Sequence, residues 1–176
     1  MFPVYKTDRI LLRKIISTDI ENVFKGLSNP SVIKYYGVSY DTLESTKTQM
    51  SWFDEIVNNK TGIWWAICSP DNTIFYGAAG INNIDSAHKK AEIGYWLLPD
   101  YWGRGFVAEA LPIICRYGFE KEKLHRIESF VETENQNSIK VMNALDFEHE
   151  GTLKECEIKN GKYISLHIFA KINQNL

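Results

Sequence analysis

The stretch PDYWGRGFVAEAL, residues 99–111, places two glycines and an arginine between two apolar segments. Glycine lets a ligand approach the backbone closely and tolerates a positive φ. A helix that begins after such a turn directs its first unpaired N–H groups outward and carries a partial positive charge at that end. The stretch is therefore typical either of a phosphate-binding turn or of a tight strand-to-helix turn without a ligand.

The composition limits the domain number and the classes of partner that we expect for this chain. The chain has 176 residues, of which 44% are hydrophobic, so we expect a single domain over residues 1–176 with one full core. A net charge of −2 gives no reason to expect a nucleic-acid or anionic-membrane partner. Cys68, Cys115 and Cys156 lack metal-ligand spacing, which predicts buried reduced thiols, no metal, and a cytoplasmic protein. No segment has the pattern of a targeting or membrane-spanning sequence.

Hydrophobic periodicity predicts about seven strands and about four helices in a mixed α+β fold. The predicted strands lie within 9–15, 62–68, 73–84, 89–98, 125–135, 153–159 and 162–172, and the predicted helices within 20–27, 42–58, 106–119 and 137–145. Turn residues between successive strands favour hairpins. We therefore expect a mostly antiparallel sheet.

Two known phosphate-binding motifs can be compared with the glycine turn. A P-loop requires Gly-Lys followed by Ser or Thr, and that triplet does not occur. The dinucleotide fingerprint is matched in letters by Gly103, Gly105 and Ala108, with Glu128 at about the right distance to hold a ribose. The fingerprint belongs to a βαβ unit, whereas the strands before this turn are predicted to form hairpins. A dinucleotide-binding protein is therefore the weaker alternative.

Two separated segments together resemble a known family. EIGYWLLPDYWGRGFVAEAL (92–111) and VETENQNSIKVMNALDFEHEG (131–151) are similar, in order and spacing, to the GNAT (Gcn5-related) N-acetyltransferases, and specifically to the RimJ/RimL-like branch that acetylates ribosomal-protein N-termini. The resemblance extends over nearly the whole chain. It implies the GNAT fold, in which the sheet is splayed at its centre.

The resemblance also implies a site for acetyl-CoA as co-substrate. The loop that holds the CoA pyrophosphate through backbone N–H groups corresponds to Trp102, Gly103, Arg104, Gly105, Phe106 and Val107. Val107 stands where the family has a smaller residue. The strand edge that bonds the pantetheine arm corresponds to Trp96, Leu97 and Leu98, for which an ordinary core strand is the alternative.

The resemblance assigns the proton donor for the leaving thiolate to Ser138. The tyrosine that serves this role in the wider family is replaced here by Met142. Asn135 would bond the pantetheine arm. Asn135 and Ser138 are also residue types that cap helices, so a capping role is the competing interpretation.

The base that deprotonates the amine is expected to be Glu92, with His88 and His167 as alternatives. Glu109 lies beside the glycine turn, but its place in the first turn of the predicted helix suits a structural carboxylate. A solvated strand carboxylate is the competing interpretation of Glu92.

These expectations define a function and its alternative. The chain is expected to be an acetyl-CoA-dependent N-acetyltransferase that acts on a protein N-terminal α-amine or a small amine such as a polyamine, with a homodimer permitted. Because the usual tyrosine is missing, a CoA-binding sensor or scaffold without chemistry is the alternative. The acceptor is expected to be selected by 28–40 and by the last hairpin, where sequence varies freely on such a fold.

Overall fold

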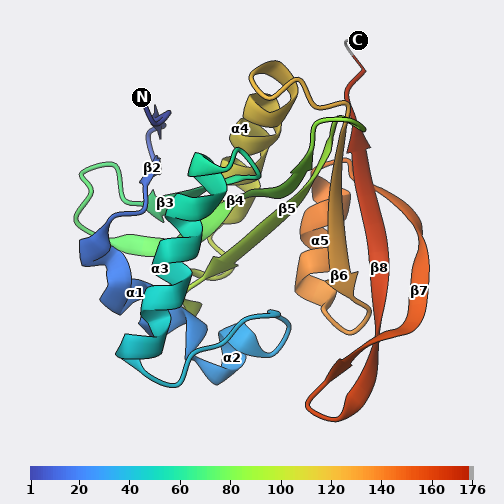
Figure 1. The fold of residues 1–176 in the computed structure, drawn as a ribbon, viewed down its shortest axis with the longest axis horizontal. Coiled ribbons are helices and arrows are strands. Elements are labelled where there is room, and N and C mark those ends of the chain that lie inside the picture. Colours follow the sequence, from blue (N-terminus) through green and yellow to red (C-terminus); the bar gives the residue numbers. More distant parts are fainter. Residues whose placement is uncertain (175–176) are drawn as a thin grey trace.

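One eight-stranded sheet organises the fold, as seen in a computed structural model that describes residues 1–174 (Figure 1). The strands lie in the order β1, β2, β3, β4, β5, β6, β8, β7. Their bounds are Tyr5–Lys6 (β1), Leu11–Lys14 (β2), Ile63–Cys68 (β3), Phe75–Asp85 (β4), Lys90–Leu97 (β5), Arg126–Glu132 (β6), Glu148–Lys159 (β7) and Lys162–Ile172 (β8). All neighbouring pairs are antiparallel except β5 and β6, which confirms the predicted mostly antiparallel sheet.

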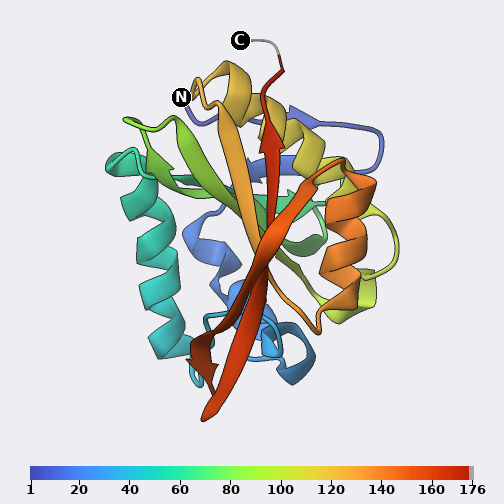
Figure 2. The same cartoon turned by 90° about the vertical axis from the view of Figure 1, so that its right-hand side faces the viewer.

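Helices cover both faces of the sheet. They are α1 (Ile20–Leu27), α2 (Pro30–Ile33), α3 (Leu43–Asn58), α4 (Phe106–Glu120) and α5 (Gln136–Ala144), with 3-10 turns at Ser17–Asp19 and Pro99–Tyr101. The first three helices lie on one side of the sheet, and α4 and α5 lie on the other (Figure 2). The sheet therefore separates two apolar cores, one packed against α1 and α3 and the other against α4 and α5.

Strand β5 contributes to both cores because successive side chains of a strand point to opposite faces. Ala91, Ile93 and Leu97 are buried on the side of α4, whereas Trp96 and Leu98 are buried on the side of α1 and α3. This alternation determines from which face each residue of the candidate site is approached.

The centre of the sheet forks between β5 and β6. The two strands pair in parallel only from Lys90 opposite Arg126 to Glu92 opposite Glu128. Beyond that pair β5 continues along β4, and β6 continues along β8. The expected central splay is therefore present, and the separation of the two strands is visible in Figure 1.

The structure adds two short elements to those predicted. Strand β1 has two residues and α2 has four, which is too short for either to show a hydrophobic period. Helix α2 is instead defined by local chemistry, because Pro30 occupies its first turn and the Asn29 side chain accepts the N–H of Ser31 at 2.9 Å.

Two predictions about the C-terminal half and the cysteines need correction. Strand β7 begins at Glu148 rather than 153, because register shifts at His149/Gly151 and at Leu153/Glu157 interrupt the alternation of its side chains. Cys68 and Cys115 are buried and free, as predicted, but Cys156 is free and exposed, since it lies on the solvated edge strand β7. Within residues 1–174 no helix is long and apolar enough to span a membrane.

Candidate active site

The glycine turn presents its backbone at the start of α4. Gly103 and Gly105 have φ values of +70° and +80°, in the left-handed region that favours glycine. Residues 102–105 are exposed, while Phe106 and Val107 turn their side chains into the core. The Glu109 N–H is bonded to the carbonyl of Gly105, so the N–H groups of the preceding residues lie ahead of the intrahelical ladder. The exposed turn can therefore accept an anionic group.

Trp102 takes a different part in this turn from the one predicted. Its backbone N–H already donates to Pro99 at 3.1 Å, and its indole N–H donates to the carbonyl of Leu97 at 2.8 Å. The predicted row of N–H donors is therefore reduced to 103–107. Trp102 instead ties the end of β5 to the glycine turn.

The N-terminal segment holds the turn from its other side. Arg9 donates from Nη2 to the backbone carbonyl of Arg104 and lies 3.5 Å from the carboxylate of Glu109. The Arg9 guanidinium also lies over the Phe106 ring, 5.2 Å from its centroid. Glu109 accepts a further hydrogen bond from Thr7. These contacts support the structural role predicted for Glu109.

The edge of β5 that faces the fork supplies unpaired backbone. The Leu98 N–H donates to Tyr76 on β4 at 2.8 Å, so the main-chain groups of Leu97 point to the opposite, open edge. Of the three residues predicted to bond pantetheine, Leu97 therefore offers its main-chain N–H to the fork. Trp96 and Leu98 contribute buried side chains. Among residues 1–174 the buried indole N–H of Trp96 has no acceptor.

A hydrogen-bonded group crosses the fork from β5 to α5. The hydroxyl of Tyr95 donates to Ser138 Oγ at 2.9 Å, and Asn135 Nδ2 donates to the same oxygen at 3.0 Å. Burial raises the pKa of Tyr95 to about 12, although its contact with Ser138 lowers it in part. The Tyr95 hydroxyl is therefore protonated at neutral pH.

The capping interpretation applies to Asn135 and not to the Ser138 hydroxyl. Asn135 Oδ1 accepts the backbone N–H of Ser138 at 3.2 Å and so caps α5. Among the residues that the structure describes, the Ser138 hydroxyl forms hydrogen bonds only with the Tyr95 and Asn135 side chains. Met142, at the position of the missing tyrosine, is fully buried in the core. The serine is thus the hydroxyl that α5 presents to the fork.

Glu92 lies at the point where β5 and β6 separate. It forms the last parallel pair with Glu128, whose carboxylate is engaged by Arg126 at 2.6 Å and lies 3.5 Å from Lys90. Within residues 1–174 the Glu92 carboxylate has neither an ion pair nor a hydrogen bond. By the alternation of β5 it lies on the face of α1 and α3, opposite the face of Tyr95 and Ser138. The Ser138 hydroxyl and the Glu92 carboxylate therefore approach the fork from opposite faces.

The two histidines considered as bases have other surroundings. The backbone N–H of His88 donates to Asp85 at 2.9 Å in the turn between β4 and β5. His167 lies on β8, where its Nδ1 is 3.0 Å from Nε2 of His149 and 2.8 Å from the hydroxyl of Thr152. Burial lowers the pKa of His167, and the charge of His149 adds to this effect. Glu92 remains the base candidate at the fork.

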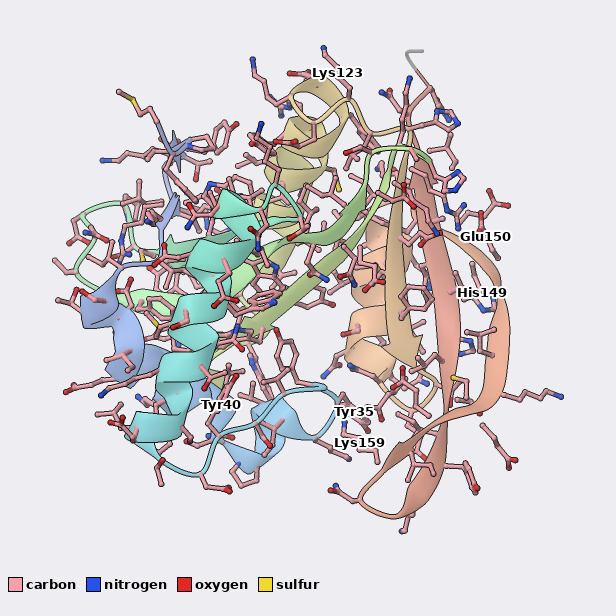
Figure 3. The ribbon with its side chains drawn as sticks, in the orientation of Figure 1. Tyr35, Tyr40, Lys123, His149, Glu150 and Lys159 are labelled. Atoms are coloured by element: carbon pink, nitrogen blue, oxygen red, sulfur yellow. The ribbon has the colours of Figure 1, made fainter. Side chains whose placement is uncertain are left out.

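Near α2, one lysine connects the last hairpin with β6 and with the segment after α2. Lys159, on the β7–β8 hairpin, lies beside Tyr35 of the segment after α2 (Figure 3). Its Nζ donates to the Lys34 carbonyl and to Glu132 Oε1, both at 2.5 Å. The two segments predicted to select the acceptor, 28–40 and the last hairpin, therefore touch each other.

Sequence reasoning missed Tyr95, Arg9 and Lys159. Tyr95 lies inside the quoted motif, but a tyrosine on a predicted strand indicates only an ordinary packed strand position. Arg9 is 95 residues from Arg104 along the chain, and Lys159 is 125 residues from Lys34. No local pattern encodes contacts of that range.

Comparisons with known proteins agree with this geometry. Residues 9–148 match the family model described as the acetyltransferase (GNAT) domain. The chain is 32% identical over 171 residues to the uncharacterized N-acetyltransferase YoaA of Bacillus subtilis, covering 97% of each chain, and 31% identical over 96 residues to the ribosomal-protein-serine acetyltransferase of Escherichia coli, covering 54% of each. It superposes on the ribosomal-protein-S5-alanine acetyltransferase of Vibrio fischeri with a TM-score of 0.87 at 21% identity, covering 98% of each chain.

The matches also bear on the branch of the family. The ribosomal-protein relative agrees with the RimJ/RimL-like branch that the two motifs indicated. The chain belongs to the GNAT family of N-acetyltransferases.

Proposed function

We propose that this chain transfers the acetyl group of acetyl-CoA to the N-terminal α-amine of a protein. The observation that carries the proposal is the fork between β5 and β6, with an exposed glycine turn at one end and unpaired backbone along β5. Exposed N–H groups at a helix start suit a pyrophosphate, and an open strand edge suits an amide-containing arm. The donor chemistry of the chain thus fits CoA.

In the proposed reaction, a C–N bond forms between the amine nitrogen and the acetyl carbon, and the C–S bond breaks with its electron pair on sulfur. The proton lost by the amine balances the proton gained by the thiolate. Glu92 would take the amine proton, because its carboxylate is free and lies at the fork. Ser138 would donate a hydrogen bond to the sulfur from the opposite face.

The charges beside the fork favour a single amine over a polyamine. A polyamine needs several free carboxylates along its length, whereas Glu128 is held by Arg126 and Glu132 by Lys159. A protein N-terminus needs one carboxylate and an open approach for the chain behind it. Glu92, whose carboxylate has no ion pair within residues 1–174, meets the first requirement. We also propose a cytoplasmic location, which the free cysteines support.

The proposal is tested by measuring CoA release with peptides beginning in serine or alanine, the same peptides blocked at the α-amine, and spermidine. We expect release with the free peptides alone, and mass spectrometry should find the acetyl group on the α-amine. CoA release only with spermidine would show that the acceptor is a polyamine and not a protein N-terminus. No release with any amine, together with saturable CoA binding, would favour the sensor.

The Ser138→Ala variant tests the acid in the same assay. Because its hydrogen bond strengthens only as charge develops on sulfur, kcat should fall about 10²-fold while the KM for acetyl-CoA stays nearly constant. Ser129→Ala, on the neighbouring strand β6, is the matched control and should retain its kcat. A Ser138→Ala variant with normal kcat would remove Ser138 from the mechanism.

A further inference from the structure

Ser138 Oγ is held by two donors from different elements. The Tyr95 hydroxyl reaches it from β5 at 2.9 Å, and Asn135 Nδ2 reaches it from the residue that caps α5 at 3.0 Å. A serine oxygen can accept two hydrogen bonds and can donate one. Both accepting positions are therefore occupied.

The remaining proton of the Ser138 hydroxyl has no acceptor among residues 1–174. A hydroxyl that accepts two hydrogen bonds is also polarised toward donating its own proton. We propose that Tyr95 is a positioning residue that fixes the Ser138 hydroxyl as a hydrogen-bond donor to the thiolate leaving group. This inference rests on the proposed function, and it assigns a role to a residue that contacts Ser138 and not the substrate.

Three features of Tyr95 suit it to this role. Its ring packs against the core on the α4 side, so the hydroxyl is held in place. Its raised pKa keeps the phenol protonated, and only a protonated phenol can donate to Ser138. It also stands on β5, so its hydrogen bond links the two sides of the fork where β5 and β6 no longer pair.

Capping does not explain the contact. The cap of α5 is complete with Asn135 Oδ1 and the Ser138 N–H, and it would remain if Tyr95 were phenylalanine. The hydroxyl of Tyr95 has Ser138 as its partner and forms no hydrogen bond with a backbone group of residues 1–174. Removal of the Tyr95 hydroxyl should therefore change the hydrogen bonding of the Ser138 hydroxyl and leave the cap of α5 intact.

The first test uses CoA alone and requires no acceptor. We would measure the thiol pKa of bound CoA from thiolate absorbance in the wild type, Tyr95→Phe, Ser138→Ala and the double variant. A donated hydrogen bond stabilises the thiolate, so Tyr95→Phe and Ser138→Ala should each raise this pKa, by about 0.5 to 1 unit. The double variant should match Ser138→Ala. An unchanged thiol pKa in Tyr95→Phe would overturn the inference.

The control is Tyr117→Phe, which removes a hydroxyl bonded to Glu122 at 2.6 Å on the outer part of α4. This variant should leave the thiol pKa of bound CoA unchanged. A shift as large as that of Tyr95→Phe would indicate a general effect of losing a tyrosine hydroxyl and would contradict the inference.

The second test follows turnover and separates this inference from the proposed function. Tyr95→Phe should lower kcat about 3- to 10-fold with little change in either KM, and should cause no further loss in the Ser138→Ala background. A merely structural tyrosine would lower kcat in both backgrounds. Turnover that depends on Ser138 but not on Tyr95 would refute only the positioning role, whereas CoA binding without turnover by the wild type would refute the proposed function.

Discussion

The glycine turn at residues 102–105 and the hairpin between β7 and β8 are both exposed, yet they are held in different ways. The turn is fixed by Arg9 on one side and by the Trp102 indole on the other, and the buried Phe106 follows it directly. Strand β7 of the hairpin is exposed along nearly its whole length, and Lys159 ties the hairpin to the segment after α2. A region that binds through its backbone needs fixed geometry, whereas a region that selects among acceptors needs variable side chains.

The largest effect is expected from Gly105→Val. A branched residue is strained at φ +80°, so the turn must shift, and the KM for acetyl-CoA should rise about 10- to 100-fold. Gly161→Val is the matched control, because Gly161 has a similar φ of +74° but lies in the hairpin, where an added Cβ would meet no atom within 4 Å. It should leave the KM for acetyl-CoA unchanged. Equal effects of the two variants on this KM would remove the distinction between the regions.

A smaller effect is expected from Lys159→Met. Loss of its hydrogen bonds to Lys34 and Glu132 frees the hairpin from α2, so the KM for the acceptor should rise about 3- to 10-fold while that for acetyl-CoA stays constant. Lys162→Met, at the paired position on β8, serves as control. If steady-state kinetics with the preferred peptide show an effect on acetyl-CoA instead, the assignment of the hairpin to the acceptor is wrong.

The clamp on the turn should give an effect smaller still. Arg9→Lys keeps the positive charge but loses the planar guanidinium group, whose nitrogens reach Arg104 and Glu109 together. The KM for acetyl-CoA should rise about 2- to 5-fold, with kcat nearly unchanged. Arg116→Lys, on the exposed surface of α4, should be neutral in the same assay. A neutral Arg9→Lys would mean that the turn holds its shape without the N-terminal segment.

The smallest effect concerns the stability of the hairpin. The pKa of His167 is lowered in the folded chain. The folded chain therefore binds a proton at this histidine less readily than the unfolded chain does. Stability should therefore fall as pH drops from about 7 to about 5.5, through the ordinary histidine pKa. The melting temperature of His167→Asn should depend less on pH over this window than that of the wild type, with His88→Asn as control. If the melting temperatures of the wild type and of His167→Asn changed equally with pH, His167 would not contribute to the pH dependence of stability.

The same contrast explains what could be predicted from the sequence. The glycine turn, the capped helix α3 after Thr42 and the strands of the central sheet follow from local patterns, and the structure contains them all. Two motifs about thirty residues apart also sufficed to indicate the family, and the role of Ser138 that the resemblance implies stays a prediction. The partner of Ser138 could not be predicted, because Tyr95 meets it only after the sheet forks. Nor could the contact between Lys159 and Lys34, which depends on the path of two exposed segments.

One measurement tests the central claim that the forked edge and the glycine turn bind CoA through backbone groups. Amide hydrogen exchange of the chain would be followed residue by residue by NMR, with and without CoA. We expect slower exchange at the N–H groups of Tyr95 and Leu97 and across 103–107, and unchanged exchange across 155–161 in the hairpin. Saturable CoA binding that leaves the amides of Tyr95, Leu97 and the turn unprotected would contradict the claim.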